Sequence, residues 1–327
     1  MTFKGFLREL ERAQRRAIRE EERVRKQQLK EQERFNAQEQ FENYQAFIHT
    51  IKSLHKKVPN TINWREINNK KPPVKPVFSN KIEKAAKAKL KNYVPSFWDK
   101  LFRLTPKKIN KMEQEIQDAP AKDKAIFDEE MGKYEQAYVK WQEMHEFSEA
   151  ILAENIPAYQ QVFEEVCLPC FKETEEKESP LCAEFQKQYL LVNIMVKNID
   201  NIIPTYVLSL TSTGKLSRKN MPISKRNELY QDYICSYFLA VIRTIFAAIP
   251  VPAVLAHAKI EGLNTATGKI EPQIIVSAWI PRETLDKINF DLIDPSDCMK
   301  NFICNMKFSK TKGFIPVQPV LPPVDIG

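Results

Sequence analysis

Three turns in the C-terminal half carry lysine, glycine and hydroxyl side chains together, a combination that can contact phosphate oxygens. They are GLNTATGKIEP (262–272), LTSTGKLSRKN (210–220) and KFSKTKGF (307–314). If these turns converge, the basic residues on and beside them are candidate contacts to nucleic acid or another polyanion: Lys215, Arg218, Lys219, Lys225, Arg226, Lys269, Lys307, Lys310 and Lys312. The alternative is that Lys, Gly, Ser and Thr are ordinary loop residues, and spacing alone does not decide convergence.

The first of these turns does not have the pattern of a nucleotide-binding P-loop. That motif reads G-x-x-x-x-G-K-[ST], and its hydroxyl side chain binds Mg²⁺. Here five residues separate Gly262 from Gly268, and Ile270 occupies the hydroxyl position. A P-loop also needs a helix after it, whereas a strand is expected on each side of this turn. We therefore expect a hairpin connection.

Other reactive side chains do not form a complete site in the sequence. Cys167 and Cys170 form a single C-x-x-C, and Cys182 could add a third ligand, but a structural zinc site needs four. Buried or incidental cysteines are the leading interpretation, with metal binding and redox chemistry as alternatives. The carboxylates of DPSD (294–297) could bind a cation, although helix capping explains them. We predict no cofactor, no metal and no catalytic residue.

Composition limits the class of protein. The chain has 327 residues, a formal charge of +8 and a pI near 9.0, so a polyanionic partner is plausible, as is a merely solubilising charge. No secretory signal precedes the first charges. The most apolar window, 238–256, contains Arg243, Pro250 and Pro252, which a membrane span would not tolerate. We expect a cytoplasmic protein without a transmembrane segment.

The N-terminal half is expected to be helical. Residues 1–58 form a charged helix whose later part carries an apolar seam suited to a partner helix: Phe41, Tyr44, Ile48, Ile51, His55 and Val58. Its first turn, with Phe3, Phe6 and Leu7, either packs on protein or lies on a membrane surface. Residues 59–80 form a Pro-rich linker anchored by Trp64 and Ile67.

Residues 81–178 are expected to form a helical coiled-coil hairpin. DAPAKD (118–123) is the predicted turn, and the return helix carries an aromatic seam that is structural rather than ligand-binding: Phe127, Met131, Tyr134, Tyr138, Trp141, His145 and Ser148. Such helical seams could mediate contact with a protein partner or a second copy of the chain.

Residues 179–327 are expected to form an α+β domain. Alternating β-branched stretches predict a mostly antiparallel sheet. The segment 223–249 is apolar almost all round in its second half, so it should be a long buried helix beneath the sheet. Ser224 is its expected N-cap and Pro250 its stop. The fold class is therefore α+β, with long N-terminal helices in front of the sheet.

Several blocks of the sequence resemble uncharacterised bacterial coiled-coil proteins. These blocks are GLNTATGKIEPQIIVSAWIPRETLDKINFDLIDPSDCMKNF (262–302), MKFSKTKGFIPVQPV (306–320), FENYQAFIHTIKSLHKK (41–57), NWREI (63–67), LSLTSTGKLSRKNMP (208–222) and ELYQDYICS (228–236). The sheet block is also similar to the C-terminal segment of larger proteins with a small β-rich domain of unknown function. The resemblance implies a bacterial cytoplasmic setting and, by analogy, a role in anti-phage defence, but it carries over no catalytic residue.

Taken together, these features favour a non-enzymatic binding or adaptor protein. Its α+β domain would contact nucleic acid or another polyanion, and its coiled-coil arm would serve association. The opposed hypothesis is a nuclease or nucleotide-acting hydrolase, with a site built from the TGK turns and the DPSD acids. A pure scaffold is the third alternative. A concave pocket lined by acids and lysines would favour the enzyme, and a broad basic face would favour binding.

Overall fold

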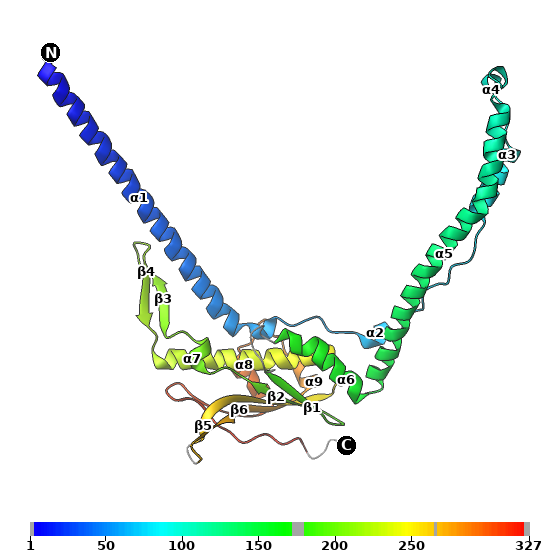
Figure 1. Ribbon diagram of the computed structural model, residues 1–327. Helices are drawn as coiled ribbons and strands as arrows, with labels where there is room; N and C mark the ends of the chain where they lie inside the picture. The colour runs from blue at the N-terminus through cyan, green and yellow to red at the C-terminus, as the bar shows by residue number, and fades with distance from the viewer. Residues whose placement is uncertain (1–2, 172–179, 265–266, 324–327) are drawn as a thin grey trace. The chain divides into compact units, whose positions relative to one another are not determined.

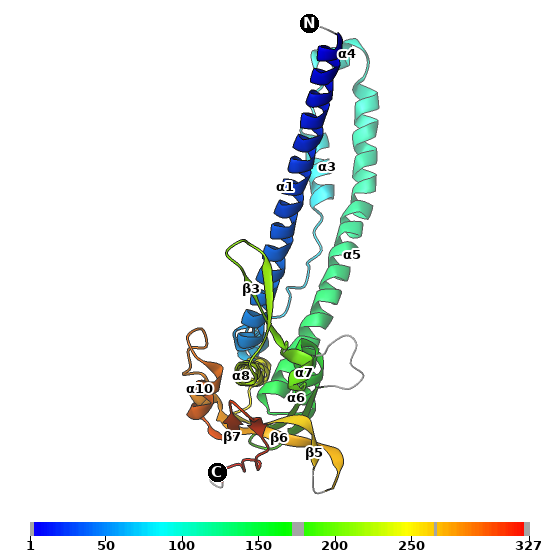
Figure 2. The ribbon, with the colours of Figure 1, turned by 90° about the vertical axis from the view of Figure 1, so that its left-hand side faces the viewer.

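The computed structural model describes residues 3–171, 180–264 and 267–323, and the side chains of residues 3–14, 17–18 and 99–100 lie outside this description. The first-turn residues Phe3, Phe6 and Leu7 are among them. The chain divides into two compact units, a sheet unit (residues 1–62 and 159–327) and a hairpin unit (residues 63–158). Figure 1 and Figure 2 show the elements of both. The fold class is α+β, as predicted.

A six-stranded sheet forms the base of the sheet unit, in the order β1-β2-β5-β6-β7-β8. Every neighbouring pair is antiparallel except β2 and β5, which are parallel. This confirms the predicted, mostly antiparallel sheet. The strands are β1 (Leu181–Phe185), β2 (Leu190–Met195), β5 (Ala253–Asn264), β6 (Lys269–Pro281), β7 (Ile303–Ser309) and β8 (Gly313–Ile315).

The helix α8 (Ile223–Ala248) is the centre of the core, with seventeen buried residues along its length. Its second half is buried almost all round, as its composition predicts. The expected N-cap is wrong. The helix begins at Ile223, two residues before the start that an N-cap at Ser224 would give, and it follows Pro222, whose φ of −57° suits a helix start. Ser224 therefore lies inside the first turn, and α8 has no side-chain cap hydrogen bond.

The face of the sheet opposite α8 is covered by the C-terminal segment. Ala253, Leu255 and Trp279 pack with Val320 in a small apolar cluster. The backbone N–H of Val320 donates to the Ser277 hydroxyl at 2.7 Å. Because both faces are covered, β5 and β6 are buried on consecutive residues rather than on alternate ones, which explains their continuous apolar sequence.

The long helix α1 (Phe3–Lys52) and the turn η1 (Leu54–Lys56) pack on α8 through the predicted seam. Ile51 and His55 are buried, and the remaining seam residues are half-buried. Nearer its N-terminal end, α1 contacts a two-stranded hairpin. This hairpin consists of β3 (Tyr206–Leu210) and β4 (Leu216–Asn220) and rises beside α1 in Figure 1. No helix in the described part of the chain is long and apolar enough to cross a bilayer.

Short elements connect these parts. They are α7 (Ile199–Ile202), α9 (Arg282–Leu285), α10 (Pro295–Cys298), η4 (Met299–Asn301), the π-helical turn η2 (Phe163–Cys167) and the 3₁₀ turn η3 (Leu168–Cys170). The CLPC pair thus ends a helical stretch, as expected. The helix α6 (Ile156–Val162) crosses the division between the two units.

The hairpin unit reverses direction at a different place from the one predicted. Its helices are α2 (Trp64–Asn68), α3 (Lys81–Lys91), α4 (Phe97–Leu101) and α5 (Thr105–Leu152). The expected turn at 118–123 is wrong, because α5 continues through Pro120. An internal proline costs a helix about 3 kcal/mol, and the packing of α3 on α5 offsets that cost. The reversal instead uses residues 92–104.

The aromatic seam of α5 is covered by the chain's own linker. Trp141 Nε1 donates to the carbonyl of Lys70 at 2.7 Å, and His145 Nδ1 lies 3.0 Å from the carbonyl oxygen of Asn68. The rings of Trp64 and Phe147 pack edge to face at 5.7 Å. The seam is therefore a packing surface, and Trp64 anchors the linker as predicted.

Candidate functional site

The structure places the nine predicted basic residues in four groups on the sheet unit. Lys215 follows the β3–β4 turn, with Arg218 and Lys219 on β4; Lys225 and Arg226 lie in the first turn of α8; Lys307, Lys310 and Lys312 lie on the β7–β8 hairpin; Lys269 begins β6. All are exposed except Arg226, which is half-buried. Within the described residues, only Arg226 and Lys310 are ion-paired, and the other seven form no ion pair: Lys215, Arg218, Lys219, Lys225, Lys269, Lys307 and Lys312.

Two of these groups come together. Lys310 Nζ lies 2.5 Å from the Glu228 carboxylate, and the Asn227 amide donates to the Lys310 carbonyl at 2.9 Å, so the β7–β8 turn rests against the start of α8. Arg226 is committed to structure, since it pairs with Asp200 at 2.8 Å and donates to the carbonyl of Ile203.

The remaining groups stay apart. The β3–β4 hairpin and the ends of β5 and β6 lie on opposite sides of α8 in both views (Figure 1 and Figure 2). The basic residues are therefore spread over opposite sides of α8 and do not line one cavity.

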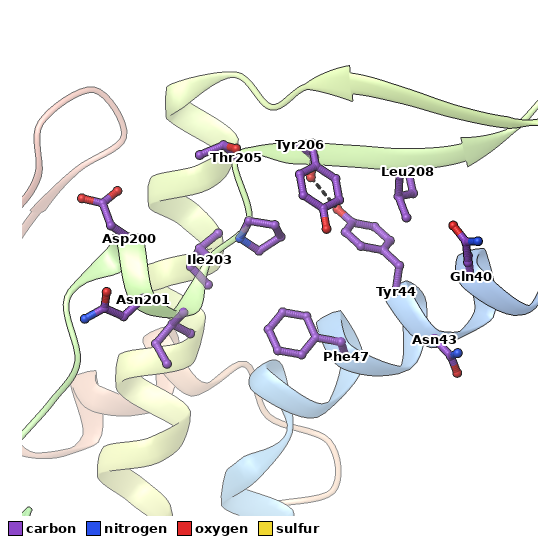
Figure 3. Close-up of a pocket in the computed structure, with 12 residues that line it drawn as sticks. Gln40, Asn43, Tyr44, Phe47, Asp200, Asn201, Ile203, Thr205, Tyr206 and Leu208 are labelled. Atoms are coloured by element: carbon purple, nitrogen blue, oxygen red, sulfur yellow. Dashed lines mark hydrogen bonds between the residues drawn. The ribbon is translucent and has the colours of Figure 1, made fainter. Parts of the chain in front are cut away.

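A cavity of about 700 Å³ lies between α1 and the segment that runs from α7 into β3 (Figure 3). Such a volume is typical of small-ligand pockets. Amide, aromatic and apolar side chains line it, with one carboxylate: Gln40, Asn43, Tyr44, Phe47, Asp200, Asn201, Ile202, Ile203, Pro204, Thr205, Tyr206 and Leu208. Its mixture of hydrogen-bonding amides and aromatic rings suits a planar polar group.

One face of α1 supplies four of the twelve lining residues. Gln40, Asn43, Tyr44 and Phe47 recur at helical spacing, so they project toward the same side. Figure 3 shows Tyr44 and Phe47 pointing toward the β3 segment. Of these four residues, only Tyr44 was singled out from the sequence, as part of the packing seam.

Two tyrosines hold the cavity wall together. The rings of Tyr44 and Tyr206 stack with centroids 6.2 Å apart, and the Tyr44 hydroxyl donates to the Tyr206 carbonyl at 3.3 Å. Burial, followed by the nearby Tyr206 phenol, raises the pKa of Tyr44. Tyr44 therefore stays a neutral hydrogen-bond donor.

Arg218 connects the cavity to the basic hairpin. Its guanidinium lies 3.8 Å from the centroid of the Tyr206 ring, a cation–π contact. In the antiparallel register Arg218 is opposite Leu208, which lines the cavity, whereas Lys219 is opposite Val207. Since successive residues of a strand point to opposite faces, Arg218 lies on the cavity side of the hairpin and Lys219 on the other.

The tip of the same hairpin rests on α1. Arg34 Nε donates to the carbonyl of Thr213 at 3.1 Å. Gly214 has a φ of 76°, and a Cβ added there would lie 3.3 Å from Arg34 Cγ. Glycine at this turn therefore provides both the left-handed backbone and room for the arginine. Arg34 adds a further cation to the hairpin tip.

A second cavity of about 380 Å³ contains Arg243 and Arg282. Both guanidinium groups are tied to the protein itself. Arg282 donates to three carbonyls at the end of α8, and Arg243 donates to the His55 carbonyl while lying 4.0 Å from the Phe290 centroid. Burial lowers the pKa of each arginine. These contacts give the two residues structural roles.

The acids of the alternative enzyme site have structural partners, and one thiol of the separate C-x-x-C pair is buried. The Asp294 carboxylate caps α10 by accepting from the backbone N–H of Ser296 (2.9 Å) and Asp297 (3.1 Å), as predicted. Asp297 pairs with Lys300 at 2.6 Å. Burial raises the pKa of Cys167 to about 12, which disfavours its thiolate. No group of three His, Cys, Asp or Glu suited to a metal occurs among the residues described.

Comparison of the chain with models of protein families, with curated proteins and with solved structures found no match. The chemistry of the cavity therefore follows from its own side chains. These are an aromatic and amide lining beside the exposed Arg218.

Proposed function

We propose that this chain is a non-enzymatic binding or adaptor protein whose sheet unit contacts nucleic acid in single-stranded form. The supporting observation is the position of Arg218 over the Tyr206 ring, at the rim of a cavity lined by aromatic and amide side chains. Proteins that bind single strands combine cations along the backbone path with aromatic surfaces for the bases. The β3–β4 hairpin and the adjoining face of α1 offer both.

The basic side chains and the cavity side chains would contact different parts of the nucleic acid. Arg218 and Lys215 would contact phosphates, while Phe47 and the amides of Asn43 and Asn201 would contact a base in the cavity. A binding role is favoured over hydrolysis because the Asp294 carboxylate is occupied in capping α10 and Asp297 is paired with Lys300.

The long helices would serve association with a protein partner or a second copy, in the bacterial cytoplasm. A role in anti-phage defence stays a prediction from the sequence resemblance alone.

Fluorescence anisotropy tests the proposal directly. The full chain is titrated into labelled single-stranded DNA, RNA, duplex DNA and heparin at two salt concentrations. We expect single strands to bind tightest and binding to weaken with salt. Replacing Arg218 and Lys215 with Ala should reduce the salt slope by about two. The matched control replaces two exposed lysines elsewhere on the sheet unit, Lys187 and Lys287.

The cavity is tested separately. Phe47→Ala should weaken single-strand binding by about ten-fold or more, since stacking on one base contributes about 1–3 kcal/mol. Phe35→Ala removes an exposed phenylalanine of the same helix outside the cavity and should have no effect. Equal binding of heparin and single strands, with no effect of Phe47→Ala, would reduce the proposal to general polyanion binding. No binding at low salt would overturn it and leave a protein partner.

A further inference from the structure

The reversal between α3 and α5 exposes a cluster of large apolar side chains. Its members are 56% to 83% exposed, although most such residues are buried in folded proteins: Val94, Phe97, Trp98, Leu101 and Phe102. They lie on and next to α4, at the end of the hairpin unit opposite α2 (Figure 1). We call this group of five residues the tip cluster. Contiguous exposed apolar surface of this kind marks an interaction site.

The tip cluster is ordered by contacts among its own rings. Phe97 packs edge to face on Trp98 at 5.8 Å, and Trp98 stacks on Phe102 at 5.9 Å with an interplanar angle of 13°. One face of the Trp98 indole is therefore already covered by Phe102. The cluster presents a preformed apolar surface rather than separate rings available for stacking on bases.

The sequence around the tip cluster is strongly basic. Residues 87–111 contain seven lysines and Arg103 but only one acidic residue, Asp99, a formal charge of +7 out of +8 for the whole chain. Lys91, Arg103, Lys107 and Lys111 are exposed and form no ion pair with any described residue. Lys87 and Lys89 are paired with Glu83 and Glu115, so the apolar aromatic surface is flanked by these four exposed cations.

From this arrangement we propose that the tip cluster docks on an anionic lipid bilayer and inserts into its interface. Tryptophan and phenylalanine favour the boundary between headgroups and acyl chains, and clustered Lys and Arg are attracted by anionic headgroups. A nucleic acid would match the charge, but Val94 and Leu101 offer it neither hydrogen bonds nor stacking. Of these two partners, only the bilayer matches both the charge and the aliphatic and aromatic surface.

Vesicle flotation with the full chain tests this proposal. The probes are vesicles of phosphatidylcholine alone and of phosphatidylcholine with an equal amount of phosphatidylserine. We expect binding only to the second kind. Replacing Lys91, Lys107 and Lys111 with Gln should lower the partition coefficient by about 100-fold, since each basic side chain near an anionic leaflet contributes roughly five-fold. The matched control replaces three exposed lysines farther along α5: Lys122, Lys124 and Lys140.

The contribution of the apolar side chains to vesicle binding is tested separately. Phe97→Ser with Trp98→Ser should lower binding by about ten-fold or more, whereas Val139→Ser with Met144→Ser, two exposed positions elsewhere on α5, should not. Trp98 is the one exposed tryptophan of the four, all of which lie in the described residues. Trp98→Phe should therefore keep vesicle binding but lose the blue shift of tryptophan emission.

Three results would overturn the proposal. The first is equal binding to both kinds of vesicle, or to neither. The second is an equal loss in the tip and control variants. The third is a tip variant that loses single-strand binding while vesicle binding is unchanged, which would make the cluster a nucleic-acid site. Because Arg218→Ala should leave vesicle binding intact, failure of this proposal is distinguishable from failure of the proposed function.

Discussion

The carboxylate of Asp123 caps a helix that starts near Ile82, 41 positions earlier in the chain. Oδ1 accepts from the backbone N–H of Ile82 at 3.0 Å, and Oδ2 accepts from the N–H of Glu83 at 3.0 Å. The local N-cap residue of α3, Asn80, makes no side-chain cap hydrogen bond. Asp123 is buried inside α5, so one side chain both satisfies the orphan donors of α3 and fixes its position on α5.

Replacing this carboxylate should destabilise the hairpin unit. Asp123→Ala leaves two backbone donors of α3 without their acceptor, which we expect to lower the free energy of unfolding by about 1–2 kcal/mol. Urea unfolding followed by tryptophan fluorescence measures the change. Asp118→Ala, at an exposed position of the same helix, should alter the free energy of unfolding by less than about 0.5 kcal/mol. Equal losses in the two variants would contradict the capping role.

The same residue shows why part of the fold was predictable and part was not. Helices and strands followed from apolar periodicity, and the cap at Asp294 followed from local sequence, because these signals come from neighbouring residues. DAPAKD contains Pro120 and two aspartates, which locally favour a turn. The helix persists there because Asp123 bonds to a distant segment, and no local pattern contains that information.

The candidate site was less predictable for the same reason. Exposed basic loops were identified from composition, but the cavity depends on Tyr44 contacting Tyr206, 162 positions away. The spacing of Gln40, Asn43, Tyr44 and Phe47 marks one helix face, yet it does not say what faces it. Likewise, the tip cluster is exposed only because the chain reverses at 92–104.

A second prediction concerns the end of α5. Glu154 has a φ of 57°, its N–H bonds to the Ile151 carbonyl, and the Asn155 N–H bonds to the Ala150 carbonyl. This is a Schellman motif whose left-handed position usually holds glycine. Glu154→Gly should raise the free energy of unfolding by about 1 kcal/mol. Glu154→Ala keeps the Cβ and should give no gain, so a similar rise in both variants would refute the backbone explanation.

A third prediction concerns pH. Burial lowers the pKa of both His55 and His257 below the ordinary histidine value. The unfolded chain therefore binds more protons than the folded chain as pH falls below about 6.5, and acidification should reduce stability. We expect the free energy of unfolding to decrease between about pH 7.5 and about pH 5.5.

Variants test whether these two histidines cause the pH dependence of stability. His55→Gln and His257→Gln should each flatten the pH dependence, whatever they do to stability at neutral pH. The exposed His49→Gln serves as the control and should leave the slope unchanged. A slope that is identical in all four proteins would show that neither buried imidazole contributes.

A fourth prediction concerns Arg282, which caps the C-terminal end of α8. Its Nε, Nη1 and Nη2 atoms donate to the carbonyls of Val251 (3.0 Å), Phe246 (3.0 Å) and Ile249 (2.7 Å). A lysine keeps the charge but cannot reproduce this fork, so Arg282→Lys should lower the free energy of unfolding by about 2–3 kcal/mol. Lys287→Arg makes the reverse exchange at an exposed position and should be neutral. Unchanged stability of Arg282→Lys in urea would mean that charge alone, placed at the negative end of the helix dipole, stabilises this end of α8.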